Sequence, residues 1–256
     1  MFPDENKKII QLLRSNDEQN IDLAFQLCIS IKETYNEDVA SELHKYVFKC
    51  VKYGLEKNYY KNLKTLELEG QNLTELPVEV HELICLEALY IDNNQLEELP
   101  KDISKLSNLE LLNVHKNKLS ILPAEISNLT KLTGLYLSEN QLSSIPQELG
   151  ALDQLFELTI SNNNIDKIPS SIGNLKKLVA LYLDKNNIES LPVEICQLYN
   201  LDTLNISNNK ISTLPRDLET LQGLHFLDLR HNPIAESEIL RLKESLPDCE
   251  VYYDQD

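Results

Sequence analysis

A 23-residue period runs through residues 63–234 and restricts the possible fold more than any other feature of the chain. Eight copies follow one another without insertion or deletion. Their first positions give the register: Leu63, Leu86, Leu109, Leu132, Leu155, Leu178, Leu201 and Leu224. An uninterrupted period of roughly 20–29 residues is typical of solenoids, in which each copy stacks on the next. We therefore expect an elongated array of equivalent turns.

The fourth copy shows what each turn must bury. Leu135 and Leu137 are separated by one residue, so both side chains lie on the same face of a short strand. A single strand cannot remove its own leucines from water, and the copies must therefore stack to form a shared core.

Two further positions predict how each turn leaves its strand. An asparagine at the ninth position can satisfy the backbone groups of a tight turn. It recurs as Asn94, Asn117, Asn140, Asn163, Asn186, Asn209 and Asn232, and Gln71 replaces it in the first copy.

A proline at position fifteen fixes φ and lacks an N–H, so it should direct the chain onto the outer surface. It recurs as Pro77, Pro100, Pro123, Pro146, Pro169, Pro192 and Pro215. Apolar residues such as Ile103 and Leu106 should then attach this outer segment to the core.

The resulting pattern, L-x-x-L-x-L-x-x-N-x-L followed by L-P-x-x-I-x-x-L, resembles the leucine-rich repeat family over about two thirds of the chain. The resemblance implies an α/β solenoid: a right-handed leucine-rich repeat horseshoe with a parallel β-sheet on its concave face, a helical N-terminal cap and a short C-terminal cap. It also implies that the asparagines form a ladder. The eighth copy lacks the Leu-Pro pair, which predicts the end of the array at residue 234.

Residues 1–62 do not repeat and are predicted to be helical. Asp4 is expected to cap a first helix that ends near Ser15, and Asp17 or a neighbouring residue is expected to cap a second helix. A third helix is expected over residues 37–58. The apolar stripes of the second and third helices are Ile21, Ala24, Phe25, Cys28 and Ile29, and Val39, Leu43, Tyr46, Val47, Cys50, Val51, Gly54 and Leu55. We interpret the segment as a cap over the first repeat, with a separate docking segment as the alternative.

Residues 235–256 are expected to form the C-terminal cap. Ile239, Leu242 and Leu246 have helical spacing, and the segment after Pro247 should return as a short strand.

Charge and composition restrict the partners. The 24 basic and 41 acidic residues give a net charge of 24 − 41 = −17, of which residues 1–60 carry −2. Such a surface repels nucleic acid and anionic membranes and favours neutral or basic protein partners, although it can equally be a solvated surface. No stretch reaches the roughly 18 apolar residues of a membrane span, and the first residues lack a signal-peptide core. We expect a cytoplasmic protein, favour a monomer, and retain secretion by a signal-independent route as an alternative.

The five cysteines do not have disulfide or metal-site spacing. Cys28 and Cys50 are expected in the core, and Cys85 and Cys196 as unpaired thiols near the outer surface. This usage fits a reducing compartment.

Candidate binding residues lie between the repeated leucines, where side chains face away from the core. Tyr90, Tyr136 and Tyr182 recur in alternate copies at one outward position, and Ala88, Gly134 or Ala180 precedes each by two residues. A large ring beside a small residue predicts a knob and a shallow pocket, and tyrosine is enriched at binding hot spots. The other predicted contacts are Asp92, Asn113, His115, Asp184, Asn205 and Phe226. The alternative interpretation is that Tyr and Thr simply suit a pleated surface.

Catalytic patterns are weak. His115 and Ser138 resemble a dyad only by residue type, and no Gly-rich phosphate loop is present. We expect no cofactor, no metal and no enzymatic activity. The leading hypothesis is a non-catalytic protein–protein interaction module. The alternatives are a regulatory subunit or secreted effector that docks through residues 1–62, and a receptor-type repeat for carbohydrate or lipid.

Overall fold

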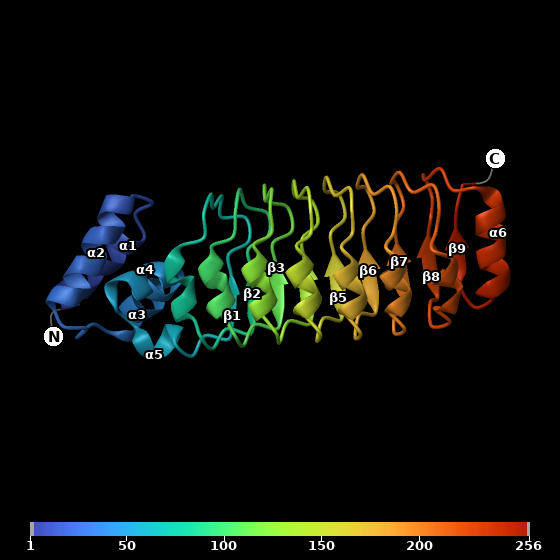
Figure 1. Cartoon of the computed structure of the whole chain (residues 1–256). Helices are drawn as coiled ribbons and strands as arrows, with labels where there is room; N and C mark the ends of the chain where they lie inside the picture. Colours follow the sequence, from blue (N-terminus) through green and yellow to red (C-terminus); the bar gives the residue numbers. More distant parts are fainter. Residues whose placement is uncertain (1–2, 255–256) are drawn as a thin grey trace. The chain divides into compact units, whose positions relative to one another are not determined.

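The computed structural model describes residues 3–254, which divide into two compact units (Figure 1). The helical unit comprises the described part of residues 1–63 together with residues 77–85. The repeat unit comprises residues 64–76 and the described part of residues 86–256. Residues 77–85 belong to the first 23-residue copy by sequence, yet they pack with the helices.

The helical unit contains more breaks than its sequence predicted. Its elements are α1 (Pro3–Leu13), α2 (Glu18–Ser30), α3 (Glu37–Leu43), the 3-10 turn η1 (His44–Tyr46), α4 (Val47–Tyr53), α5 (Lys57–Tyr60) and η2 (Val78–Glu82). Asp17 caps α2 as predicted, and its side chain accepts a hydrogen bond from the Gln19 N–H. The prediction for Asp4 was wrong: this residue lies inside the first turn of α1, because the helix already begins at Pro3.

The single third helix predicted over residues 37–58 was also wrong. The 3-10 turn η1 interrupts it, and α4 ends at Gly54, whose φ of +68° is left-handed. Glycine adopts this conformation without steric cost and commonly ends helices. The predicted stripe of α2 is correct for Ile21, Ala24, Phe25 and Cys28, but Ile29 is exposed.

Aromatic and aliphatic side chains fill the core of the helical unit. Phe25 is fully buried, and its ring centroid lies 5.3 Å from that of Tyr53 and 6.3 Å from that of Tyr46. Val80 and Leu83, from the outer segment of the first copy, are fully buried as well. The helices therefore use part of the first repeat as core.

In the repeat unit, nine strands form one parallel sheet in sequence order within the described residues (Figure 1). They are β1 (Thr65–Glu67), β2 (Ala88–Tyr90), β3 (Leu111–Asn113), β4 (Gly134–Tyr136), β5 (Glu157–Thr159), β6 (Ala180–Tyr182), β7 (Thr203–Asn205), β8 (Phe226–Asp228) and β9 (Glu250–Tyr252). Neighbouring strands pair with a shift of one period, as Leu112 pairs with Leu135. The predicted repeat solenoid with a parallel sheet is confirmed.

A short 3-10 turn follows each proline on the outer side of the repeat. In the repeat unit these turns are η3 (Lys101–Lys105), η4 (Ala124–Asn128), η5 (Gln147–Ala151), η6 (Ser170–Asn174), η7 (Val193–Gln197) and η8 (Arg216–Thr220). Ile103 and Leu106 are fully buried, as expected for residues that attach this layer to the core. Cys196 was expected near the outer surface but is buried, because its turn packs against neighbouring turns.

The asparagine ladder is present from Asn94 to Asn232. Each amide Nδ2 donates to a backbone carbonyl just after the strand of the preceding copy, as from Asn117 to Ile91 at 3.0 Å. Each Oδ1 accepts a backbone N–H, as Asn117 Oδ1 does from Leu96 at 3.0 Å. Gln71 is exposed and takes no equivalent place.

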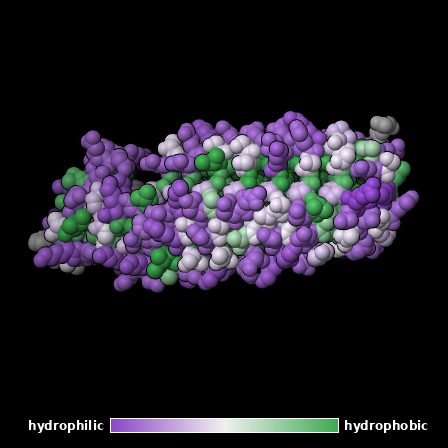
Figure 2. All heavy atoms as spheres, viewed as in Figure 1, coloured by the Kyte–Doolittle hydropathy of each residue, from purple (hydrophilic) through white to green (hydrophobic). Residues whose placement is uncertain are grey.

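The chain closes with α6 (Glu236–Ser245) and β9, which pairs with β8, as predicted for the C-terminal cap. Ile239, Leu242 and Leu246 are buried. None of the helices in the described part of the chain is both long and apolar enough to span a bilayer. Figure 2 shows that hydrophilic residues cover most of the face in view, with hydrophobic residues in smaller groups.

Candidate interaction surface on the parallel sheet

The sheet face is the side of the sheet whose side chains point away from the leucine core. The strand register stacks equivalent positions of successive copies into columns. The tyrosine column runs through Glu67, Tyr90, Asn113, Tyr136, Thr159, Tyr182, Asn205, Asp228 and Tyr252. All three tyrosines selected from the sequence therefore lie in one line on β2, β4 and β6, at about 10 Å intervals for strands about 5 Å apart.

Tyr136 lies back along its own strand. A Cβ atom added to Gly134 would lie 3.0 Å from Tyr136 Cε2 and 3.1 Å from its hydroxyl oxygen. The ring therefore occupies part of the space beside Gly134, because a glycine leaves room for the ring of the next outward residue. Both residues still line a hollow, in keeping with the shallow pocket predicted for a ring beside a small residue.

A hydrogen bond holds the Tyr136 ring in place. Its hydroxyl donates to Glu157 Oε2 on the neighbouring strand at 3.0 Å. Burial, together with the adjacent Glu157 carboxylate, raises the pKa of the Tyr136 phenol to about 12. Burial also raises the pKa of the Tyr182 phenol. Tyr136 is therefore a neutral donor at physiological pH, and Glu157 is a contact that the sequence analysis did not select.

Asp92, Asn113 and His115 form a chain of contacts at the C-terminal ends of β2 and β3. Asn113 Nδ2 donates to Asp92 Oδ1 at 3.0 Å, and Asn113 Oδ1 accepts the His115 backbone N–H at 3.0 Å. His115 Nε2 lies 3.6 Å from Glu139 Oε1. The predicted residues are thus brought together, and their mutual bonds fix the rotamers of Asp92 and Asn113.

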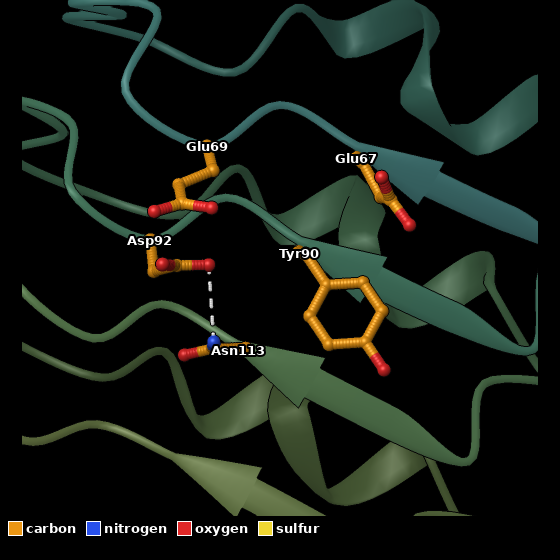
Figure 3. Close-up of a pocket in the computed structure, with 5 residues that line it drawn as sticks. All are labelled: Glu67, Glu69, Tyr90, Asp92 and Asn113. Atoms are coloured by element: carbon orange, nitrogen blue, oxygen red, sulfur yellow. Dashed lines mark hydrogen bonds between the residues drawn. The ribbon is translucent and has the colours of Figure 1, made fainter.

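A polar hollow of about 540 Å³ lies beside this chain (Figure 3). It is lined by Glu67, Glu69, Tyr90, Asp92 and Asn113. In the view, the Tyr90 ring and the three carboxylates surround the opening. Glu67 and Glu69 were not selected from the sequence, because acidic residues are common over the whole chain. The hollow presents a strongly negative surface.

Further along the sheet, Asp184 and Asn205 are held by hydroxyl groups. Ser161 Oγ donates to Asp184 Oδ1 of the next copy, and Ser207 Oγ donates to Asn205 Oδ1 at 2.9 Å. Asp184 is half-buried, so it remains accessible from the sheet face. Both predicted residues lie on that face but make no direct contact with the Asp92 group.

Phe226, another of the predicted contacts, belongs to an aromatic pair at the C-terminal end of the sheet. It is half-buried, with its ring centroid 5.2 Å from that of Tyr252 on β9. Arg230 stacks on the Tyr252 ring and forms two hydrogen bonds to Asp228, at 3.0 and 2.6 Å. This cluster was not predicted from the sequence, because the columns were not extended into the C-terminal cap.

A second, more apolar hollow of about 380 Å³ crosses β3, β4 and β5. We call it the apolar groove; its lining residues are Leu111, Thr133, Gly134, Tyr136, Gln154, Phe156, Glu157 and Lys177. Phe156 is 55% exposed. It was missed because it lies immediately before β5, outside the three strand positions considered in the sequence.

Metal binding finds no support in the described side chains, since no three His, Cys, Asp or Glu residues lie close enough together to hold an ion. His225 and His231 instead pair with Asp202 and Asp254. The sheet face is thus suited to binding through shape, hydrogen bonds and charge.

Comparison with known families gave three matches. A model described as "Leucine-rich repeat region" matches residues 58–161, and two described as "Leucine Rich Repeat" match residues 154–175 and 176–234. Among curated protein sequences, none matches significantly.

Several solved structures are similar to this chain. A leucine-rich repeat protein of Leptospira interrogans is 36% identical over 77% of this chain and 57% of its own, with a TM-score of 0.62. The ectodomain of the plant membrane receptor kinase GASSHO1/SCHENGEN3 from Arabidopsis thaliana is 33% identical over 75% of this chain and 24% of its own, with a TM-score of 0.66. This chain therefore spans only part of both. Internalin C2 of Listeria monocytogenes shares the fold, with 22% identity over 81% of this chain and 92% of its own, and a TM-score of 0.68.

Proposed function

Because this chain belongs to the leucine-rich repeat family, we propose that it is a non-catalytic interaction module that binds another protein on its sheet face. The observation that carries the proposal is the tyrosine column. Tyr90, Tyr136 and Tyr182 are half-buried, stand on rigid strands, and still present part of their rings to solvent. Such anchors bind with little loss of conformational entropy.

Charge supports a neutral or basic partner surface. The carboxylates of Glu67, Glu69 and Asp92 lie around Tyr90 at the β1 end of the tyrosine column. The whole chain carries a net charge of −17. Acidic groups near an interface attract basic partners and mainly accelerate association. We further propose a cytoplasmic, monomeric protein. The plant receptor ectodomain to which this chain is similar was solved in complex with CASPARIAN STRIP INTEGRITY FACTOR 2, which supports a protein ligand here.

The alternative retains the sheet face and adds a second docking site. In that case the protein is a regulatory subunit or secreted effector whose helices α1–α5 bind elsewhere. The helical unit has its own aromatic core around Phe25, which is the observation that keeps this alternative open.

The test compares partner capture by the wild-type chain and by a triple variant, Tyr90→Ala, Tyr136→Ala and Tyr182→Ala. A partner crosslinked in lysate is identified and purified, and its affinity is measured by calorimetry. We expect the triple variant to bind about tenfold more weakly or worse. Tyr136→Ala alone should change the melting temperature little, since the leucine core is untouched.

Tyr199→Ala is the matched control, because Tyr199 is 66% exposed in the same repeat unit but lies outside the tyrosine column. It should bind like the wild type. A partner that binds the folded triple variant with unchanged affinity contradicts the proposal.

A further inference from the structure

The apolar groove differs in chemistry from the acidic hollow of Figure 3. Leu111, the Tyr136 ring and Phe156 supply its apolar surface, from three successive copies of the repeat. Phe156 exposes 55% of its surface. Single exposed apolar residues are common on proteins, but a phenylalanine that borders a hollow with two further apolar side chains indicates a place for an apolar ligand group.

The groove is formed before any ligand binds. Gly134 has no side chain, so the Tyr136 ring lies along the strand, and the bond to Glu157 Oε2 holds it there. Leu111, Gly134 and Glu157 are strand residues whose backbones are fixed by the sheet. A preformed site avoids the cost of ordering its own side chains on binding.

Positive charge lies at one side of the groove, where Lys177 is among the lining residues. Lys131, Gln154 and Lys177 occupy the same position of successive copies, immediately after the outer turns. Lys131 Nζ donates to the Asn108 amide oxygen at 2.7 Å, and Lys177 Nζ donates to Gln154 Oε1.

Both lysines thus contact neutral amides, and within residues 3–254 neither forms an ion pair. Lys64 and Lys101, by contrast, pair with Glu87 and Glu125. Asp153 reaches Lys177 only through the Gln154 side chain, whose Nε2 donates to Asp153 Oδ1 at 2.9 Å. The chain as a whole carries a net charge of −17. The two lysines can nevertheless attract a carboxylate of a partner to this side of the groove.

We propose that the apolar groove receives an aliphatic or aromatic side chain from an extended segment of the partner protein, and that an Asp or Glu within about two residues of it meets Lys131 or Lys177. The inference rests on the proposed function, since it specifies the chemistry of a partner on the same face. The spacing follows from geometry. Lys177 lines the groove and Lys131 occupies the same repeat position two copies earlier. Neighbouring strands lie about 5 Å apart, and an extended chain advances about 3.3 Å per residue.

The experiment uses a phage-displayed library of random dodecapeptides selected on the full chain. We expect enriched peptides to share an apolar residue with an acidic residue nearby. The affinity of one synthetic enriched peptide is then measured by fluorescence anisotropy. Phe156→Ala, and separately the double variant Lys131→Glu with Lys177→Glu, should each weaken it about tenfold. These residues are exposed, so circular dichroism should show unchanged folding.

Ile121→Ala is the control, because Ile121 is 57% exposed and lines neither hollow. Enrichment of basic or wholly polar peptides, absence of any enriched motif, or binding that the Phe156 and lysine variants leave unchanged would each overturn the inference. If the enriched peptides instead lose affinity for the double variant Glu69→Gln with Asp92→Asn, they bind the sheet face at the acidic hollow. That result would also overturn the inference about the apolar groove. Failure of the proposed function is read separately, from the tyrosine variants and the purified partner.

Discussion

At the scale of single residues, the buried asparagines connect the repeats. Asn140 Nδ2 donates to Val114 O and to Leu137 O, both at 3.0 Å, and its Oδ1 accepts the Leu119 N–H at 3.0 Å. The three backbone groups belong to two successive copies. One short side chain therefore satisfies polar groups that stacking would otherwise bury without partners.

Asn140→Ala should lower the free energy of unfolding by about 1–3 kcal/mol, because it leaves these backbone groups buried and unsatisfied. Urea denaturation followed by circular dichroism measures the change. Asn164→Ala is the control, since Asn164 follows the ladder residue of the next copy but is exposed. Equal stability of the two variants would show that water can replace the Asn140 amide, and would contradict this prediction.

At the scale of elements, two of the outer 3-10 turns pack so closely against the next turn that their glycines have no room for a Cβ atom. A Cβ atom added to Gly150 in η5 would lie 2.5 Å from the Ser171 carbonyl oxygen in η6. Gly173 in η6 has the same relation to the Glu194 carbonyl oxygen in η7. The close contact between turns also explains why Cys196, at the equivalent position of the next copy, is buried.

Gly150→Ala should destabilise the fold by about 1–3 kcal/mol, because the new methyl group overlaps backbone that can move only if the adjacent turn shifts. Thermal denaturation provides the measurement. Gly223→Ala is the matched substitution, since the nearest atom to its added Cβ lies at 3.5 Å, an ordinary contact. Equal melting temperatures of the Gly150→Ala and Gly223→Ala variants would contradict the close packing of the turns.

At the scale of the whole molecule, the boundary of the compact units lies within the first repeat. Residues 77–85 pack with the helices, and Val80 and Leu83 are fully buried in that unit. Removal of residues 1–62 would therefore expose apolar side chains that remain in the truncated chain.

We expect a chain that lacks residues 1–62 to aggregate or to melt at a lower temperature than the full chain, in keeping with the proposed cap. Size-exclusion chromatography and circular dichroism distinguish the outcomes. A truncated chain that stays monomeric with an unchanged melting midpoint would favour the alternative, in which the helices form a separate docking segment.

The sequence predicted the backbone of the repeats better than it predicted the N-terminal helices or the side-chain arrangement on the sheet face. It placed Tyr90, Tyr136 and Tyr182 in one column, because strand residues alternate strictly between faces. It missed Phe156 and Glu157, because ring orientation and cross-strand partners depend on side chains from neighbouring copies. The break at η1 was also unpredictable, since the apolar stripe continues across it.

By itself, the sequence determined the repeating architecture: one set of apolar side chains per 23 residues can leave water only if successive copies stack in register. Only the tertiary structure decided where the chain divides into units and how the sheet face is shaped. The physical reason is that the unit boundary and the shape of the sheet face both depend on contacts between residues that are one or more periods apart in the sequence. Such residues occupy neighbouring space and share hydrogen bonds only after the copies have stacked.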